Sequence, residues 1–253
     1  MLQALLVATA PAASIPNGPS PPIEDSVFLP AFIAMLAASF LCGSVPFALL
    51  LGRLRGLDIR KVGSGNIGAT NLGRALGRPW GIACFVLDAL KGAAPVAAFG
   101  VWRDTWGVSL GEAGANATIE WLAIAIAAIL GHVFSPWVGF KGGKGVATGF
   151  GSMVALWPLL TWPMVGALLA WAILLAVTRF MAIASVIAAA TPPAVLLVQS
   201  LQAGWPPAAA PLLVATSLVF VLVAIRHRSN VARLLAGTEP RIGARAEASP
   251  PAR

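Results

Sequence analysis

Apolar residues fill seven long stretches of the chain, and short polar stretches that hold most of the charged residues separate them. A helix needs about 20 apolar residues to cross the hydrocarbon core of a bilayer. The pattern therefore predicts an all-α polytopic membrane protein with seven transmembrane helices over residues 28–240. The expected spans are residues 28–51, 80–101, 117–135, 146–160, 163–178, 182–200 and 209–225.

The fourth and fifth stretches are near or below the length of a span. Pro158 and Pro163 lie between them, where a tight turn is expected. Short spans inside the bundle and a broken re-entrant pair are both consistent with this pattern.

The two ends of the chain are expected to lie outside the membrane domain. Residues 1–27 start apolar and then become rich in proline and serine, and no basic residue precedes the apolar run as it would in a signal peptide. We expect a disordered or interfacial leader there, and a basic disordered cytoplasmic tail over residues 241–253.

The composition agrees with a membrane domain, because 58% of the residues are hydrophobic and only 10% are charged. Soluble domains carry about 25% charged residues. The formal charge of +8 would suggest nucleic-acid binding in a soluble protein. Here the basic residues flank apolar spans, so no nucleic-acid partner is expected.

The basic residues also predict an orientation. All of the 17 lysines and arginines except Lys91 and Arg103 fall in loop 52–79, loop 136–145, the turn at residue 179 or the C-terminal tail. By the positive-inside rule these segments are cytoplasmic. With seven spans, the N-terminus is then outside and the C-terminus cytoplasmic.

The first candidate site segment follows the first span and contains GSGNIGATN at residues 63–71. Its glycines let the backbone approach a ligand, and successive N–H groups can form an anion-binding nest. Arg60 and Arg74 can bind phosphate oxygens with two N–H groups each. The alternative is a flexible loop with topogenic arginines.

The second segment, residues 131–149, is not a Walker A loop, because Gly145 follows Lys144 where that motif has Ser or Thr. It still has the parts of a phosphate cradle at a helix N-terminus. These parts are Lys141, Gly142, Gly143, Lys144, Gly145 and Thr148. The alternatives are a turn with two topogenic lysines, and a purely structural His132 at the end of the third span.

The third segment, residues 226–239, directly follows the last span. Helical spacing puts His227 and Asn230 on one face with either Val231 or Leu234. A basic stop-transfer tail is the alternative, but it leaves Asn230 and Glu239 unexplained.

Two ionisable residues, Asp88 and Lys91, lie three residues apart inside the second span. Buried charges in a span are costly and are usually paired or functional. An ion pair is expected, and whether Lys91 also reaches the site stays open.

The motifs in these three segments resemble those of the acyl-phosphate:glycerol-3-phosphate acyltransferase family over residues 28–240. The family patterns are S-x-P, D-x-R and G-S-G-N-x-G-A-T-N, then G-H…F-K-G-G-K-G-V-A-T, then H-x-x-N-x-x-R-L-x-x-G-x-E. They are matched by Ser44, Pro46, Asp58, Arg60 and residues 63–71, by residues 131–148, and by residues 227–239. One departure is Ala182, where the family's R-Y-x-S-x-x-S pattern has its first serine; Ser185 keeps the second.

The resemblance implies a multi-pass protein of the bacterial inner membrane with its site facing the cytoplasm. It also implies the transfer of an acyl group from acyl phosphate to the sn-1 hydroxyl of glycerol 3-phosphate. The products are lysophosphatidic acid and phosphate, and the step is the first acylation of phospholipid biosynthesis. The expected partners are the two substrates and the bilayer, with no cofactor and no metal.

The expected site combines these motifs, and direct attack by the glycerol hydroxyl needs no covalent intermediate. Either His227 or the leaving phosphate accepts the proton, and the loop that holds each phosphate is left open. The catalytic candidates are Ser44, Asn71, Lys144, His227 and Asn230. The phosphate-binding candidates are Arg53, Arg60, Ser64, Gly65, Asn66, Thr70, Arg74, Lys91, Lys141, Gly142, Gly143, Gly145, Val146, Ala147, Thr148 and Ser185. The supporting candidates are Asp88, His132, Arg233 and Glu239.

Two other classes of function use the same basic loops. A transporter for anions would need charges along an inner pathway, but the predicted spans lack them and show no obvious repeat. A scaffold that binds anionic lipid predicts no role for Asn71, Thr148 or Asn230.

Overall fold

The computed structural model describes residues 25–242, so nearly all of the predicted leader and tail lies outside the described residues. Every regular element in this range is a helix, which confirms the predicted all-α class. The α-helices are α1 (Asp25–Ser44), α2 (Phe47–Leu54), α3 (Ala69–Leu76), α4 (Arg78–Trp102), α5 (Ala115–Val133), α6 (Val146–Val154), α7 (Thr161–Thr178), α8 (Met181–Gln202), α9 (Ala209–Arg226) and α10 (Arg228–Leu235). Two 3-10 turns, η1 (Ile59–Lys61) and η2 (Pro136–Val138), complete them.

The chain divides into two units. The first, Met1–Ile33, contains in its described part only the start of α1, where the rings of Phe28 and Phe32 stack with centroids 5.7 Å apart. The second, Ala34–Arg253, contains the remaining elements and all three candidate site segments.

Six helical segments in residues 25–242 are long and apolar enough to cross a membrane. They are Phe28–Leu54, Arg78–Trp102, Ala115–Val138, Thr161–Thr178, Met181–Gln202 and Ala209–Arg226. The fourth predicted span is not among them, because α6 has only nine residues and is therefore about 13 Å long. The count of seven full-length spans is thus not confirmed.

The segment that contains α6 nevertheless connects the two ends of the helices. It begins after residues 139–145, which we call the glycine loop, and α6 follows directly after Gly145. By Trp157 it has reached loop 103–114, where the Gly107 N–H donates to the Trp157 carbonyl at 3.1 Å. The rings of Trp106 and Trp157 lie 6.2 Å apart there. Residues 146–157 therefore cross between the α4–α5 loop and the opposite end in a short path.

Close packing of α6 against α4 depends on glycine. A Cβ atom on Gly92 would lie 2.4 Å from the Thr148 carbonyl oxygen, and one on Gly151 would lie 2.0 Å from the Ala89 carbonyl oxygen. Because these obstacles are backbone atoms, a larger residue would push the helices apart. This packing fixes the N-terminus of α6 beside α4.

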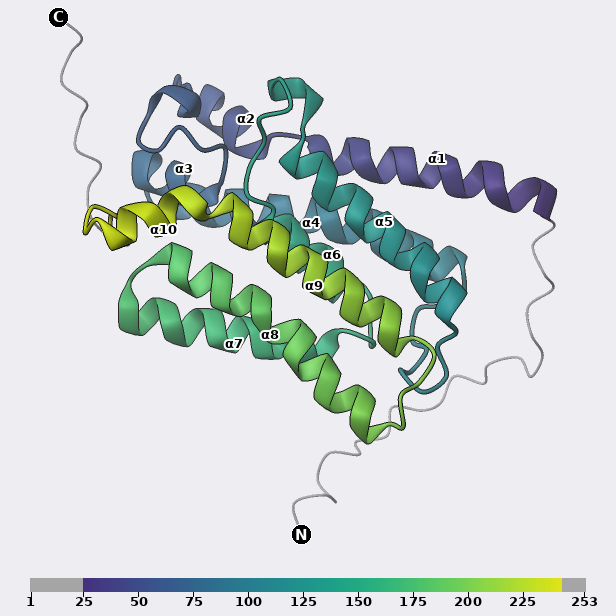
Figure 1. Ribbon diagram of the computed structural model, residues 1–253. Coiled ribbons are helices and arrows are strands. Elements are labelled where there is room, and N and C mark those ends of the chain that lie inside the picture. The colour runs from purple at the N-terminus through teal and green to yellow at the C-terminus, as the bar shows by residue number, and fades with distance from the viewer. Residues whose placement is uncertain (1–24, 243–253) are drawn as a thin grey trace, which may run out of the picture. The chain divides into compact units, whose positions relative to one another are not determined.

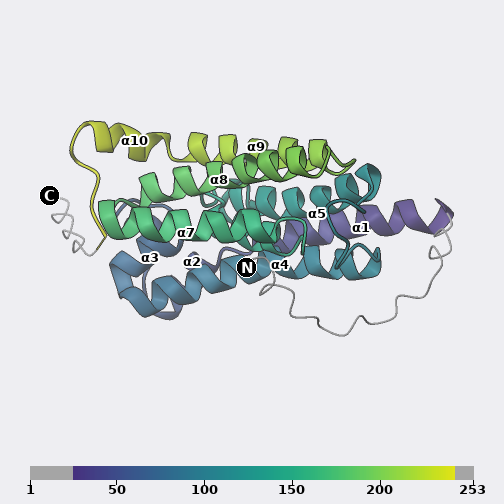
Figure 2. The same cartoon turned by 90° about the horizontal axis from the view of Figure 1, so that it is seen from below.

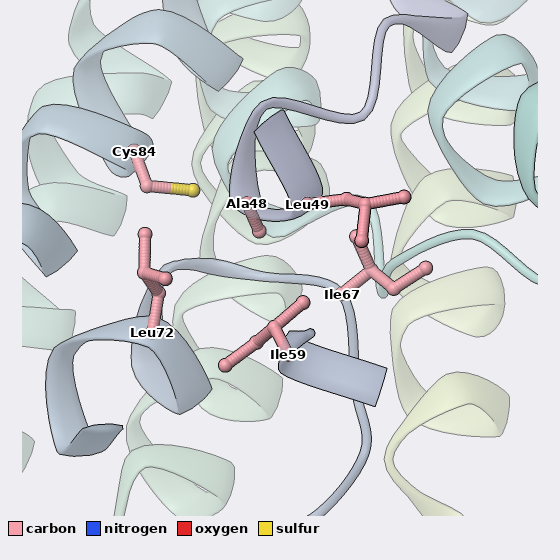
Figure 3. Packing of buried hydrophobic residues seen from close by; sticks show 6 residues of the cluster. All are labelled: Ala48, Leu49, Ile59, Ile67, Leu72 and Cys84. Carbon is pink, nitrogen blue, oxygen red and sulfur yellow. The ribbon is translucent and has the colours of Figure 1, made fainter. Parts of the chain in front are cut away.

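The first span and its following loop contain more structure than the apolar pattern predicts. The chain interrupts the helix at Val45 and Pro46, and it forms α3 between Gly68 and Gly77 in what reads as loop. Figure 3 shows the small apolar cluster that holds this region together, with side chains from α2, η1, α3 and α4. Its buried members are Ala48, Leu49, Ile59, Ile67, Leu72 and Cys84.

Candidate active site

The three polar segments meet at one end of the second unit. Figures 1 and 2 both show α3, α10 and the turn between α7 and α8 at this end. The Arg74 guanidinium donates to the Pro240 carbonyl at 3.0 Å, and the Arg226 guanidinium donates to the Gly142 and Gly143 carbonyls at 2.9 Å each. The first segment is thus bonded to the residue that directly follows the third, and the third is bonded to the second.

Asn71 holds the first segment in its shape. Its side chain is buried, its Oδ1 accepts from the Ser64 N–H at 3.2 Å, and its Nδ2 lies within 3.2 Å of the carbonyls of Ile59, Val62 and Asn66. One amide therefore ties together both ends of a loop in which Gly63 and Gly65 have positive φ. These contacts make Asn71 a positioning residue for the loop.

Gly142 and Gly143 in the glycine loop are packed too tightly for a side chain at either position. A Cβ on Gly142 would lie 2.0 Å from the His132 carbonyl oxygen, and one on Gly143 would lie 2.2 Å from His132 Nε2 and 2.7 Å from the Ile67 carbonyl oxygen. The Arg226 guanidinium donates to the carbonyls of both glycines. The peptide planes are therefore held by His132, the first segment and Arg226 together.

Lys144 lies inside a hydrogen-bonded chain that joins the second and third segments. Its ammonium donates to Asn230 Oδ1, Asn230 Nδ2 donates to Glu239 Oε1 at 2.7 Å, and Arg233 Nε donates to Glu239 Oε2 at 2.8 Å. Asn230 and Glu239 are buried. Glu239 thus fixes the orientation of the Asn230 amide, so that its oxygen faces the lysine.

Burial lowers the pKa of the Lys144 ammonium to about 8, and Arg74, Arg226 and Arg233 act in the same direction against the attraction of Glu239. The group is surrounded by three guanidiniums and one carboxylate. This excess of positive charge in a partly desolvated site favours an anion, which would compensate the repulsion.

His227 lies at the junction of α9 and α10, with its side chain buried. Its Nδ1 is 2.8 Å from the Val223 carbonyl, which can only accept, so Nδ1 carries the proton and Nε2 is the acceptor. Burial, with help from the Lys144 charge, lowers the pKa of His227 to about 4. The imidazole is therefore neutral at pH 7. Of the two predicted neighbours on its helical face, Val231 is exposed and Leu234 is partly buried, in favour of Leu234.

A small polar hollow of about 210 Å³, a volume that includes its solvent-open part, lies beside Gly142 and Gly143. In it the buried Lys91 forms the predicted ion pair with Asp88 at 2.7 Å and also donates to the Val45 carbonyl at 2.6 Å. Ser44 is buried at its edge and accepts from Trp137 Nε1 at 2.7 Å. The hollow is lined by Ser44, Pro46, Lys91, His132, Gly142 and Gly143, among others.

An open apolar cavity of about 700 Å³, a volume that includes its solvent-open part, starts on the other side of the same loop. Gly145 and Val146 line the end next to the loop, and from there the cavity continues between α6, α7, α8 and α9. Ser185 lines this cavity and is buried there. The retained serine therefore lines the apolar cavity and not the polar hollow.

Several predicted phosphate ligands lie apart from this cluster. Arg60 is exposed and bound to Asp58 at 2.7 Å, and Arg53 and Lys141 are exposed. Thr148 is fully buried in α6 where it packs on α4, and its hydroxyl has no hydrogen-bond partner within residues 25–242. Of the remaining candidates in the first segment, Ser64 and Asn66 bind the Asn71 side chain through their backbone, Gly65 lies between them with positive φ, and Thr70 lies in the first turn of α3.

Two residues that shape the site, Arg226 and Trp137, were not predicted from the sequence. Arg226 is indistinguishable by sequence from the other basic residues that follow a span, although it lies directly before His227. Trp137 fits interface anchoring equally well, and its bond to Ser44 joins positions 93 residues apart.

Comparison with known proteins places this geometry among glycerol-3-phosphate acyltransferases. The family described as glycerol-3-phosphate acyltransferase matches residues 33–237. A glycerol-3-phosphate acyltransferase of Trichlorobacter lovleyi is 43% identical over 83% of this chain and 96% of the relative. One of Sinorhizobium fredii is 42% identical over 85% and 94%.

A solved structure is similar as well. The crystal structure of PlsY (YgiH), an integral membrane glycerol 3-phosphate acyltransferase, in its glycerol 3-phosphate form matches with a TM-score of 0.71 and 33% identity, over 84% of this chain and 96% of that one. The lysophosphatidic acid form of the same protein matches with a TM-score of 0.69. These similarities confirm the family predicted from the motifs.

Proposed function

Because the chain belongs to the glycerol-3-phosphate acyltransferase family, we propose that it transfers an acyl group from acyl phosphate to the sn-1 hydroxyl of glycerol 3-phosphate. Lysophosphatidic acid and inorganic phosphate are the products. The solved relative has glycerol 3-phosphate and lysophosphatidic acid forms, which supports this acceptor and this product. The assignment of acyl phosphate as the donor rests on the basic group and the apolar cavity of the site.

One observation carries the proposal: a single glycine loop borders both hollows. Gly142 and Gly143 line the polar hollow, while Gly145 and Val146 line the apolar cavity. Lys144 lies between these pairs in the chain. A phosphate held at Lys144 and at the N-terminus of α6 therefore has an apolar path for its acyl chain on one side. On the other side lies the polar hollow, where Lys91 and Ser44 suit a small phosphate ester with two free hydroxyls.

The acyl phosphate is placed with its phosphate at Lys144 and its chain in the apolar cavity, and glycerol 3-phosphate is placed in the polar hollow near Ser44 and Lys91. The acceptor hydroxyl attacks the acyl carbonyl, the C–O bond to phosphate breaks, and the phosphate leaves with the electron pair. Lys144 and the loop N–H groups stabilise the charge on the leaving phosphate. Positioning of the two substrates supplies much of the acceleration.

The leaving phosphate is the better acceptor for the hydroxyl proton. A phosphate monoester has a second pKa near 6, and a phosphate that leaves with the bonding electron pair is more basic than that, whereas burial lowers the pKa of His227 to about 4. A stronger base takes up the proton more readily. His227, with Nε2 as acceptor, then orients the attacking hydroxyl, and Asn230 holds Lys144 in place.

The same proposal includes an orientation in the bacterial inner membrane. Counting the short passage of residues 146–157 as a crossing gives seven, which puts the N-terminus outside and the C-terminus in the cytoplasm. Its support is that the three segments and the basic loops lie at one end, where the Ile242 N–H donates to the Arg179 carbonyl at 2.8 Å.

The test is transfer by purified protein in nanodiscs. With palmitoyl phosphate and glycerol 3-phosphate, we expect equal amounts of phosphate and 1-palmitoyl-glycerol 3-phosphate, and no phosphate release above background without the acceptor. Palmitoyl-CoA and palmitoyl-acyl carrier protein are the control donors and are expected to be inactive. Transfer from either of these, with none from palmitoyl phosphate, would contradict the proposed donor.

A further inference from the structure

The apolar cavity has two distinct ends, and four helices order its lining in the same way. Ser185 on α8, Val223 on α9, Trp171 on α7 and Gly145 before α6 line one end. The other end is lined by residues seven positions away on α7, α8 and α9, and by Met153 on α6. On α7, α8 and α9 these residues are Met164, Pro192 and Thr216. The cavity is therefore a slot that starts beside Lys144 and His227 and runs along the helices.

The far end of the slot is closed. The side chains of Met153 and Met164 are 3% and 6% exposed. About one turn beyond the far end lie four leucines that are fully buried, at 0% exposure; two belong to α8 and α9, and two to the connection between α6 and α7. These are Leu156, Leu160, Leu196 and Leu212. Two flexible thioethers backed by a solid layer of leucine thus form a floor.

The side of the slot is open, in contrast to its floor. Among the residues that line the slot, Leu168 is 44% exposed, and Phe85, Phe150 and Trp171 are partly exposed. The rings of Phe85 and Phe150 lie 6.3 Å apart. A chain that reaches the floor therefore has a lateral way out towards the surrounding apolar phase.

The depth of the slot can be expressed in carbon atoms. Seven helical residues rise about 10 Å, and an extended chain advances about 1.2 Å per bond, so the slot holds roughly nine carbons. We infer that Met153 and Met164 are specificity-determining residues that set how many methylenes the protein holds, while the rest of a longer chain turns out of the open side. This inference rests on the proposed function only for the identity of the ligand.

A binding experiment tests the slot without any turnover. The probes are n-alkyl phosphonates with 4 to 14 carbons, measured against protein in nanodiscs and corrected for partition into empty nanodiscs. Each methylene held in the slot is expected to raise affinity about fourfold relative to water. The rise in affinity with each added methylene should end near nine carbons in the unchanged protein. In the Met153→Ala/Met164→Ala variant it should end near eleven to twelve carbons.

A matched pair of phenylalanine variants gives a second measurement. Ala188 lines the middle of the slot, whereas the neighbouring Ile187 on the same helix is exposed and lies off the slot. Ala188→Phe is expected to move the end of this rise to about five carbons and to lower kcat/KM for dodecanoyl phosphate relative to butanoyl phosphate by tenfold or more. Ile187→Phe is expected to match the unchanged protein in both.

The outcomes distinguish failure of the slot inference from failure of the proposed function. If phosphonates bind with the expected chain-length break but no acyl phosphate is turned over, the slot stands and the proposed function fails. If transfer occurs but the break stays at the same length in Ala188→Phe and in the double methionine variant, the inference is overturned and the proposed function stands.

Discussion

Replacing Lys144 with alanine is expected to lower kcat/KM for acyl phosphate by about 100- to 1,000-fold, the usual loss when a charge-stabilising donor is removed from a transition state. Lys144 lies in the chain between the glycines that line the two hollows, and its ammonium is held by Asn230. Initial rates of phosphate release at subsaturating donor measure this effect. An alanine variant with unchanged kcat/KM would contradict the assignment.

The same lysine also predicts a pH dependence. Its pKa in the folded protein is about 8, so it is charged below pH 8 and neutral above it. We expect kcat/KM to fall above pH 8, because the neutral amine attracts phosphate weakly. In Lys144→Arg, whose guanidinium stays protonated, the alkaline fall should move above pH 10. A fall that stays near pH 8 in this variant would assign the titration to another group.

The second large effect is expected for Gly143→Ala. The new methyl group would lie 2.2 Å from His132 Nε2 and 2.7 Å from the Ile67 carbonyl oxygen, so the glycine loop must move away from the first segment. Overpacking of this kind costs about 1–3 kcal/mol of stability, and we expect the folded fraction to lose kcat/KM by 100-fold or more.

A matched control exists in Gly111, where an added methyl group meets nothing within 4 Å. Gly111→Ala is expected to keep both the melting temperature and kcat/KM of the unchanged protein. Full activity of folded Gly143→Ala, isolated by size-exclusion chromatography, would show that the tight loop geometry is not needed for transfer.

The spans could be predicted because lipid exposure demands long apolar helices, and length alone identifies them. The same rule fails for α6, which is short because its role is to pack on α4 through Gly92 and Gly151 and to present its N-terminus to the site. A count of apolar residues does not distinguish such a segment from a span.

The candidate site was predictable in its segments but less so in its individual contacts. Lys144, His227 and Asn230 do lie together, as their motifs imply. The contacts of Asn71 and Arg226 are mostly with backbone carbonyls, which every residue has and which the sequence therefore does not distinguish. The hydroxyl of Thr148 is buried because packing against α4 fixes the rotation of α6, which the sequence alone does not determine.

The second and third segments are proposed to bind phosphate as one unit. A double-mutant cycle on Lys144 and Asn230 tests this most directly. The measurement is kcat/KM for Lys144→Ala, Asn230→Ala and the double variant. Residues that act as a unit are non-additive, so the double variant should lose no more than the worse single one. Losses that multiply would show that the two side chains act independently, and the shared site would be refuted.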